Sequence, residues 1–410
     1  MIIIKNEAFK TVHLSFQFIE KIEEDAYAYR FLLARLLTSY TKSFPTKKKL
    51  IDEFARLYGA FISNQIFLLG QYHVLRFTLV FPNPNLFDDP SFTDDLLKLT
   101  KEIFYDRTLF DESSFNEVKR YAIEYIQTKN DRKFELAKDQ LMSHLFPQHP
   151  YGKTITGSLE QIKSITTHEL FDYYQRYFLK NDMKMVLSGM VDVQTIEKIK
   201  TMLEPYESKD ALKIAKIPVV KKRFTQHESY TTMQQAYLFL CYSIPLERKD
   251  PLFLATQLVS TMIGGYPDSM LFKRFREEQM LAYDVESHYE YDKKYLFVFA
   301  GVDINNRHDA LMELQSLIEN YIKEGPTEEE LITAKKFLKT QVFTSLDQHG
   351  THIARAFLSM MFHLDESIED TLKQLDEVKL SDIHDVLSLM SLSTSYVLSG
   401  GEDHESLEDF

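Results

Sequence analysis

The order of secondary structure expected along this 410-residue chain repeats once, and that repetition constrains its fold more than any other feature. Each half begins with a strand, continues with two helices, a two-stranded hairpin and further helices, and closes with a strand. The two series start roughly 200 residues apart. Antiparallel strands followed by helices are typical of α+β domains. We therefore expect two homologous lobes derived by duplication, each a mainly antiparallel sheet with helices packed on one face. Two unrelated α+β domains of similar order are the alternative.

The first half shows the pattern most clearly. Apolar and polar residues alternate through 12–18, which predicts a strand with one solvated face. The segment 27–37 is apolar on nearly every side and predicts a buried helix. Strands are expected at 60–68 and 71–81, with Gly70 in the turn between them. A second helix at 46–57, later helices up to Phe146, and a closing strand at 185–191 complete this half.

The second half is expected to repeat these elements, and composition suggests where the two halves meet. Strands are expected at 223–228, 233–243, 282–291, 295–302 and 395–399, with helices at 251–263, 269–278, 306–323, 327–346 and 353–363.

Capping boxes that mark helix starts are expected in both halves, at Ser114 with Glu117, Ser158 with Gln161, Thr166 with Glu169, and Thr327 with Glu330. The expected divisions are a lobe at 1–205, a lysine-rich linker at 206–222, a lobe at 223–400 and an acidic tail at 401–410.

Charge and cysteine content narrow the functional classes. The chain has 48 Lys and Arg against 61 Asp and Glu, a net charge of −13, which argues against nucleic acid or an anionic membrane as its main partner. The single cysteine, Cys241, permits neither an intramolecular disulfide nor a thiolate metal cluster, and we expect it to be a small buried side chain. No apolar stretch reaches the roughly 18 residues that span a bilayer, and residues 1–10 lack a secretory signal pattern, so a cytoplasmic protein is expected.

Several short motifs follow one another along nearly the whole chain. They are Leu109-Phe110-Asp111-Glu112, Phe146-Pro147-Gln148-His149-Pro150-Tyr151-Gly152 with Gly157, Gly264-Gly265 with Arg276-Glu277-Glu278 and Leu281-Ala282-Tyr283, and Glu329-Glu330-Leu331 with Ala334-Lys335-Lys336. In this order they resemble the pitrilysin/insulinase family of inverted-motif zinc peptidases. Each motif is short, and it is their shared order that carries the resemblance. It implies the family's two-lobed fold and peptide substrates.

The zinc motif of that family is missing from this chain. Active members bind zinc through H-x-x-E-H on the first helix, where the two histidines bind the metal and the glutamate acts as general base, and a later helix supplies a third ligand. No histidine here begins H-x-x-E-H or H-E-x-x-H. The resemblance aligns Phe31 with the first histidine, Ala34 with the base, Arg35 with the second histidine and Tyr125 with the third ligand.

These four side chains are unsuited to zinc, which needs about three nitrogen or oxygen ligands. Arg35 would add a permanent positive charge that repels a dication. Glu124 is next to the third ligand position, but one residue along a helix turns a side chain by about 100°. We therefore expect no metal, no cofactor and no peptidase activity from the chain alone. A less favoured interpretation is an active peptidase with unrecognised ligands, such as Glu124 with a distant histidine.

A second functional pair of the family has counterparts in this sequence. The resemblance implies that an arginine and a tyrosine seven residues apart in the second lobe bind the substrate backbone, and Arg276 and Tyr283 match that spacing. An ordinary helix arginine and strand tyrosine are the alternative. In heterodimers of the family, one subunit carries zinc and the other carries this pair. The leading hypothesis is therefore a non-catalytic subunit that pairs with an active homologue, while homodimers are also conceivable.

Two further hypotheses concern a scaffold role and a metal site. The chain could be a scaffold or peptide-binding protein with no proteolytic partner, as some relatives are structural proteins of large assemblies. His349 and His352 could hold a metal because they are three residues apart at an expected helix start, but no third ligand is evident nearby. We expect these two histidines to lie in a solvated capping region.

Overall fold

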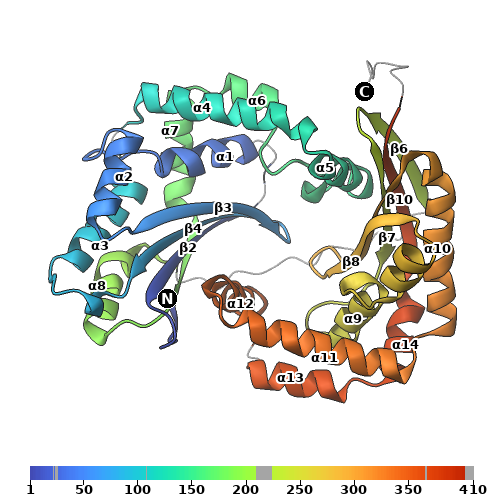
Figure 1. Ribbon diagram of the computed structural model, residues 1–410. Helices are drawn as coiled ribbons and strands as arrows, with labels where there is room; N and C mark the ends of the chain where they lie inside the picture. Colours follow the sequence, from blue (N-terminus) through green and yellow to red (C-terminus); the bar gives the residue numbers. More distant parts are fainter. Residues whose placement is uncertain (22, 24–25, 108, 209–223, 365–366, 402–410) are drawn as a thin grey trace. The chain divides into compact units, whose positions relative to one another are not determined.

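The computed structural model of the chain forms two compact units (Figure 1). It describes residues 1–410 apart from 22, 24–25, 108, 209–223, 365–366 and 402–410. Most of the expected linker at 206–222 and nearly all of the acidic tail at 401–410 therefore lie outside the described residues. Within the described part of the chain, no helix is both long enough and apolar enough to cross a membrane.

Each unit combines one half of the chain with a helical segment from the other half. The first unit contains the described parts of 1–131, 149–215 and 346–363, and the second contains those of 132–148, 216–345 and 364–410. The segments 132–148 and 346–363 are thus exchanged between the halves. Nothing in the pattern of the residues indicated this exchange.

The first unit is built on a five-stranded mixed sheet in the order β1-β5-β2-β4-β3. Strand β1 is parallel to β5, and the remaining neighbours are antiparallel. The strands are β1 (Ile2–Ile4), β2 (Thr11–Lys21), β3 (Phe61–Leu69), β4 (Tyr72–Pro82) and β5 (Asp182–Ser188). Strand β5 ends three residues before the predicted end. The next residue, Gly189, has a backbone φ of 131°, which residues with a side chain rarely adopt.

Most helices of the first unit cover the apolar face of this sheet. Val12, Leu14, Phe16 and Phe18 of β2 point into one large core with residues of α1, α3 and α7. The helices are α1 (Ala26–Leu37), α2 (Lys47–Arg56), α3 (Phe92–Phe104), α4 (Glu112–Gln127), α6 (Leu159–Ser164), α7 (Thr167–Arg176), α8 (Val193–Leu203) and α12 (His349–Phe362).

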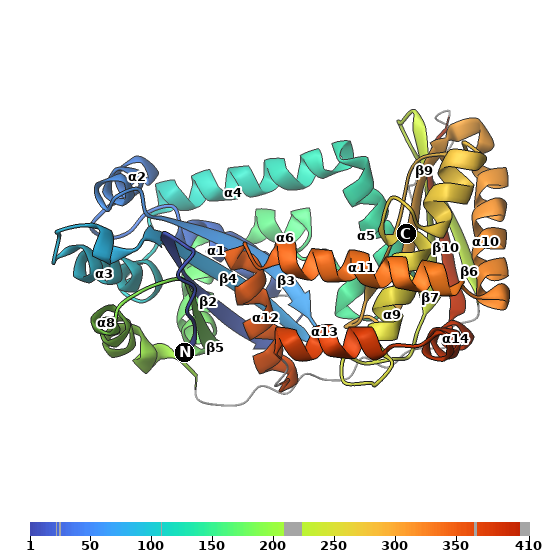
Figure 2. The same cartoon turned by 60° about the horizontal axis from the view of Figure 1, so that its bottom comes forward.

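The opposite face of β2 is also largely buried, so the prediction of a solvated face on this strand is wrong. Ser15 and Gln17 are both 0% exposed. Gln17 donates to the hydroxyl of Ser15 over 2.8 Å and accepts from Arg76 Nε over 2.7 Å. Helix α12 lies on this face, on the other side of the sheet from α1 (Figures 1 and 2), and its Phe357 packs against the Arg76 guanidinium. The alternation in β2 therefore separates an apolar core from a hydrogen-bonded polar layer beneath a helix.

The second unit repeats the topology of the first. Its sheet has the order β6-β10-β7-β9-β8, which is the first order with five added to each strand number. Here too the outer pair β6 and β10 is parallel and the other pairs are antiparallel. The strands are β6 (Thr225–Thr231), β7 (Gln235–Ser243), β8 (Ala282–Glu290), β9 (Tyr295–Asp303) and β10 (Ser391–Gly400). The predicted α+β class and the repeated order are therefore confirmed.

The core of the second unit lies between one face of this sheet and its own helices. Leu238, Leu240 and Tyr242 of β7 belong to that core. The helices of the unit are α5 (Lys133–Leu145), α9 (Phe253–Ser260), α10 (Arg307–Glu324), α11 (Glu328–Ser345), α13 (Ile368–Glu377) and α14 (Leu380–Leu389), with π-helical segments η6 (Thr261–Gly265) and η7 (Phe272–Glu278).

The exchanged helix α5 packs on the other face of the second sheet. Its Phe134 contacts the rings of Tyr237, Phe239 and Phe299. Cys241 is fully buried and unpaired in β7, as its apolar surroundings predicted. Helices α5 and α12 occupy equivalent positions in the repeat, since α5 follows the long helix α4 and α12 follows the long helix α11. Each sheet thus has helices on both faces, whereas the sequence predicted helices on one face only.

Candidate functional site

Helix α1 and helix α4 bring together three of the four residues that the resemblance aligned with the zinc site. Phe31 and Arg35 are one turn apart on α1, and Tyr125 comes from α4. The guanidinium carbon of Arg35 lies 3.6 Å from the centre of the Phe31 ring and 5.4 Å from that of Tyr125. The two ring centres are 5.7 Å apart. These residues form a cation–π cluster, which we call the Arg35 stack.

The Arg35 stack does not fit a zinc ion. Its members supply two aromatic rings and a cation, whereas zinc requires imidazole, thiolate or carboxylate ligands. Ala34 is 0% exposed and contributes only a methyl group, and Glu124 is exposed on α4. Across the described residues, no group of three or more His, Cys, Asp or Glu side chains is arranged to hold a metal ion.

Arg35 carries its charge in an unusual environment. Burial lowers the pKa of its guanidinium below the ordinary value, and the nearby Tyr125 hydroxyl partly offsets this effect. The side chain donates one long hydrogen bond of 3.4 Å from Nη1 to the carbonyl of Phe31. Within the described part of the chain it makes no ion pair with a carboxylate.

Restoring the metal ligands tests whether these positions correspond to a zinc site. We expect the wild-type chain to retain no stoichiometric zinc after dialysis, because the Arg35 stack offers no ligand. The triple variant Phe31→His, Arg35→His, Tyr125→Glu should bind about one zinc per chain, measured by plasma mass spectrometry. The double variant Phe31→His, Arg35→His should bind zinc more weakly than the triple variant, because it lacks the third ligand. Stoichiometric zinc in the wild type, or a folded triple variant without zinc, would contradict this correspondence.

Arg276 and Tyr283 belong to the second unit and come from neighbouring elements. Arg276 is in η7, where its guanidinium carbon lies 4.5 Å from the centre of the Phe272 ring. Tyr283 is 57% exposed at the start of β8. The register of β8 against β9 shifts between Ala282 and Asp284, so Tyr283 is the extra residue of a β-bulge. Bulges and π-turns both redirect side chains and are frequent near functional sites.

Neither side chain of this pair is engaged by the protein through polar contacts. Within the residues that the structure describes, neither the Arg276 guanidinium nor the Tyr283 hydroxyl makes a hydrogen bond or an ion pair. Three residues separate the end of η7 from the start of β8. The two groups are therefore available to a ligand, as a substrate-binding pair would require.

A glycine explains how η6 comes close to β8. A Cβ atom on Gly264 would lie 2.9 Å from the backbone nitrogen of Ser287, so only glycine allows this contact. Ser287 in turn donates from its hydroxyl to the carbonyl of Ser260 over 2.7 Å. The Gly264-Gly265 motif of the sequence thus has a packing role that helps to position β8.

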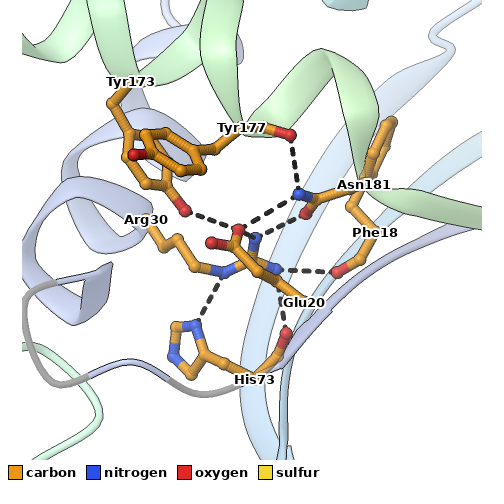
Figure 3. Close-up of polar contacts among 7 residues, drawn as sticks. All are labelled: Phe18, Glu20, Arg30, His73, Tyr173, Tyr177 and Asn181. Atoms are coloured by element: carbon orange, nitrogen blue, oxygen red, sulfur yellow. Dashed lines mark hydrogen bonds and ion pairs between the residues drawn. The ribbon is translucent and has the colours of Figure 1, made fainter.

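A buried charged network centred on Arg30, which the sequence patterns did not predict, lies in the first unit (Figure 3). Arg30 is 0% exposed, and all five of its N–H groups donate hydrogen bonds. The acceptors are Glu20 Oε2 and Asn181 Oδ1, both at 2.5 Å, His73 Nδ1 and the carbonyl of Phe18, both at 2.8 Å, and the carbonyl of His73 at 2.9 Å. The only sequence signal was an arginine in the interior of a helix that is apolar except for Arg30 and Arg35.

The Arg30 network keeps His73 neutral. Tyr173 donates its hydroxyl hydrogen to Glu20 over 2.5 Å (Figure 3). Burial lowers the pKa of His73 well below its ordinary value, and the charge of Arg30 lowers it further. His73 is therefore neutral and accepts at Nδ1 from Arg30. The network joins α1, β2, β4 and the segment after α7 in one hydrogen-bonded unit, and this role is structural.

His349 does not lie in a solvated capping region, so that expectation is wrong for this residue. Its side chain is within hydrogen-bonding distance of Ser188 Oγ (3.0 Å) and Thr11 Oγ1 (3.2 Å), and the residue is only 8% exposed. Its ring stacks on that of His13 with 4.0 Å between the centres and an angle of 11°. His352 Nε2 lies 2.8 Å from the carbonyl of Leu346.

The second unit contains a matching pair of histidines at its own exchanged helix. His144 of α5 stacks on His227 of β6 with 3.9 Å between the ring centres and an angle of 11°. Burial and the neighbouring His227 both lower the pKa of His144. Each exchanged helix therefore meets its sheet through two stacked imidazole rings.

Comparison with known proteins identifies the class of fold first. The structure resembles a conserved protein from Enterococcus faecalis V583 with a TM-score of 0.88 and 22% identity, over 98% of this chain and 96% of that one. It also resembles a peptidase M16 inactive domain from Pseudomonas fluorescens with a TM-score of 0.78 and 18% identity, over 99% and 96% of the two chains. The fold is thus the two-lobed fold of M16-like proteins.

Sequence comparison then gives the family that the chain resembles. Residues 164–338 match the family described as "Peptidase M16 inactive domain". The chain is 25% identical over 412 residues to the probable inactive metalloprotease YmfF of Bacillus subtilis, covering 98% of this chain and 95% of the relative. It is 23% identical over 293 residues to an uncharacterized zinc protease, YmxG, of the same organism, covering 70% of each. The resemblance to this peptidase family noted in the sequence is therefore confirmed, and the part of the chain that matches the family model corresponds to its inactive type of domain.

Proposed function

We propose that this chain is the non-catalytic subunit of a two-subunit M16 peptidase. It would pair with a homologue that carries H-x-x-E-H and would contribute Arg276 and Tyr283 to the binding of the peptide substrate. The observation that carries the proposal is the contrast between the two units. The first unit fills the aligned metal positions with the Arg35 stack, while in the second unit Arg276 and Tyr283 have no polar partner among the described residues.

The chemistry of the second pair suits a peptide backbone. A guanidinium donates hydrogen bonds to carbonyl oxygens, and a phenol hydroxyl can donate to the oxyanion that develops when water attacks a peptide bond. Tyr283 is exposed and is redirected by a bulge, so its hydroxyl can reach a group outside the chain. The zinc ion, the attacking water and the general base would come from the partner.

The pairing is tested by co-expressing the chain with an M16 homologue that carries H-x-x-E-H. We expect a stable complex by light scattering, cleavage of an unstructured peptide only by the complex, and loss of cleavage on chelation. Stable pairing without any cleavage would favour the scaffold alternative. Metal-dependent cleavage by this chain alone would contradict the proposal.

Substitution of the substrate pair should reduce turnover without affecting assembly. We expect Tyr283→Phe to lower kcat of the complex about a hundredfold, because one oxyanion donor is removed, and Arg276→Ala to raise KM as well. Matched controls are Tyr230→Phe, at a tyrosine that is 56% exposed, and Arg274→Ala, in the same π-helical segment. Equal effects of the controls, or no effect of either substitution, would remove Arg276 and Tyr283 from the site.

A further inference from the structure

Arg35 is a half-buried cation that has no carboxylate partner in the described part of an acidic chain. The sequence contains 61 acidic against 48 basic residues, yet Arg35 forms no ion pair there. By contrast, the fully buried Arg30, little more than one turn away on the same helix, uses all five donors within the protein. Burial without an opposite charge disfavours the charged form of Arg35, and this cost remains unless a ligand supplies the charge.

Two aromatic rings hold the Arg35 guanidinium in a defined orientation. At 3.6 Å from the centre of the Phe31 ring, the guanidinium lies in stacking contact with it, and Tyr125 provides a second ring at 5.4 Å. Stacking on rings uses the faces of the guanidinium and leaves its edge for hydrogen bonds. Apart from the 3.4 Å bond to the Phe31 carbonyl, that edge makes no hydrogen bond within the described residues, and its unbonded nitrogens are not buried.

The edge of a stacked guanidinium is a pre-organised receptor for one class of ligand. Two parallel N–H groups match the two oxygens of a carboxylate, and the charge-assisted bonds that result are about twice as strong as neutral ones. Because the rings already fix the side chain, little rotamer entropy is lost on binding. A lysine at this position would present a flexible point charge and would lack the fork.

We propose that the Arg35 stack is a binding subsite for a peptide carboxylate. The carboxylate is either the C-terminus of a bound peptide or an Asp or Glu side chain within it. This proposal rests on the proposed function, since it takes a peptide as the bearer of the carboxylate. At positions aligned with the zinc ligands of active relatives, this chain keeps a positive charge, and its charge-assisted hydrogen bonds favour an anion over a neutral carbonyl.

Binding to the isolated chain tests the subsite with two pairs of fluorescent peptides. The first pair differs only in a free or amidated C-terminus and has no acidic side chain, and the second pair is amidated and differs by one internal Glu. We expect the carboxylate peptide of at least one pair to bind roughly tenfold to a hundredfold more tightly than its neutral counterpart. The pair that shows the preference identifies the source of the carboxylate.

Variants assign the preference to the stack. Arg35→Gln should abolish the preference, and Arg35→Lys should remove most of it because the planar fork is lost. The matched control is Arg120→Gln, since Arg120 is an exposed arginine whose guanidinium carbon lies 5.6 Å from the Tyr121 ring on the same unit. It should keep the preference. Equal binding of carboxylate and neutral peptides by the wild type, or a preference that survives in Arg35→Gln, would overturn the subsite.

A titration with N-acetylglycine covers the case in which no peptide binds measurably. Tens of millimolar of this small carboxylate should shift the Nε–Hε resonance of Arg35, while N-acetylglycine amide should not. An unchanged resonance would overturn the subsite without bearing on assembly with a zinc peptidase. Conversely, a shifted resonance in a chain that forms no active complex would retain the subsite while rejecting the proposed pairing.

Discussion

Replacing Arg30 with methionine should lower the free energy of unfolding of the first unit by about 3–5 kcal/mol, the largest loss of stability that we expect from any single substitution in this unit. Methionine preserves much of the side-chain volume but removes all five donors. The carbonyls of Phe18 and His73 would then lose their bonds to the guanidinium, and Glu20, whose side chain is only 17% exposed, would lose its ion partner. Urea unfolding followed by circular dichroism measures the change.

A matched surface substitution separates the buried network from charge removal alone. Arg56 also pairs with two carboxylates, Glu53 and Asp95, but its side chain is 53% exposed. Arg56→Met should therefore cost less than about 1 kcal/mol. Glu20→Gln should have an intermediate effect, because it keeps an acceptor for Arg30 and Tyr173 but loses the charge. A loss below about 1 kcal/mol in Arg30→Met would show that the network contributes specificity rather than stability.

Local sequence patterns predicted the elements of each unit well. The capping boxes at Ser158 with Gln161 and Thr166 with Glu169 are formed as expected, and Thr327 makes the same reciprocal bonds with Glu330. These signals depend on residues within one turn of a helix, so the sequence contains all the information needed. The box predicted at Ser114 with Glu117 is wrong, because helix α4 begins earlier and Asp111 is its N-cap.

Features that depend on distant segments could not be predicted in this way. The alternation of β2 was interpreted as a solvated face, but Ser15 and Gln17 are buried. The cover comes from α12, which follows this strand by more than three hundred residues in the chain. A polar layer beneath a helix and a polar surface have the same period-two pattern. Strand β1 was missed because it has only three residues and is stabilised by pairing with β5.

In the candidate site, too, the sequence predicted which residues lie together but not the contacts that depend on distant segments. Alignment to a family motif predicted that Phe31, Arg35 and Tyr125 occupy related positions, and the structure brings their side chains together. The interaction that they make could not be predicted, since it depends on the angle at which α4 crosses α1. Arg30 was overlooked because its acceptors come from three separate segments and two of them are backbone carbonyls.

Acid should weaken the attachment of the two exchanged helices between about pH 6.5 and pH 4. Burial, together with the charges of His13 and His352, lowers the pKa of His349 to about 4. Burial also lowers the pKa of His13. A group whose pKa is lower in the folded state takes up a proton on unfolding. Its stabilising effect is complete above the unfolded value near 6.5 and is lost as the pH falls toward the folded value.

The stacked geometry makes this dependence steep. Protonation of His349 would place a charge 4.0 Å from the His13 ring, and a second proton there would add direct repulsion. The titratable groups whose charges act on His349 are His13 from β2 and His352 from α12, and no carboxylate of the described residues is among them. The opening equilibrium of α12 should therefore rise by up to about tenfold per pH unit for each proton taken up. The pair His144 and His227 should act likewise on α5.

Hydrogen exchange of the peptides covering α12 and α5, corrected for the intrinsic effect of pH on exchange, measures this opening. We expect protection of α12 to fall between pH 7 and pH 5 in the wild type. In His349→Asn, which can still bond to Ser188 or Thr11 but cannot be protonated in this range, protection should change much less with pH. The matched control is His168→Gln, since His168 is exposed on α7 of the same unit and should leave the wild-type profile intact. Direct titration of the His349 ring by NMR requires no variant. Because the predicted loss depends on a folded-state pKa far below 6.5, a ring that titrates near its ordinary value would remove the physical basis for an acid-sensitive helix.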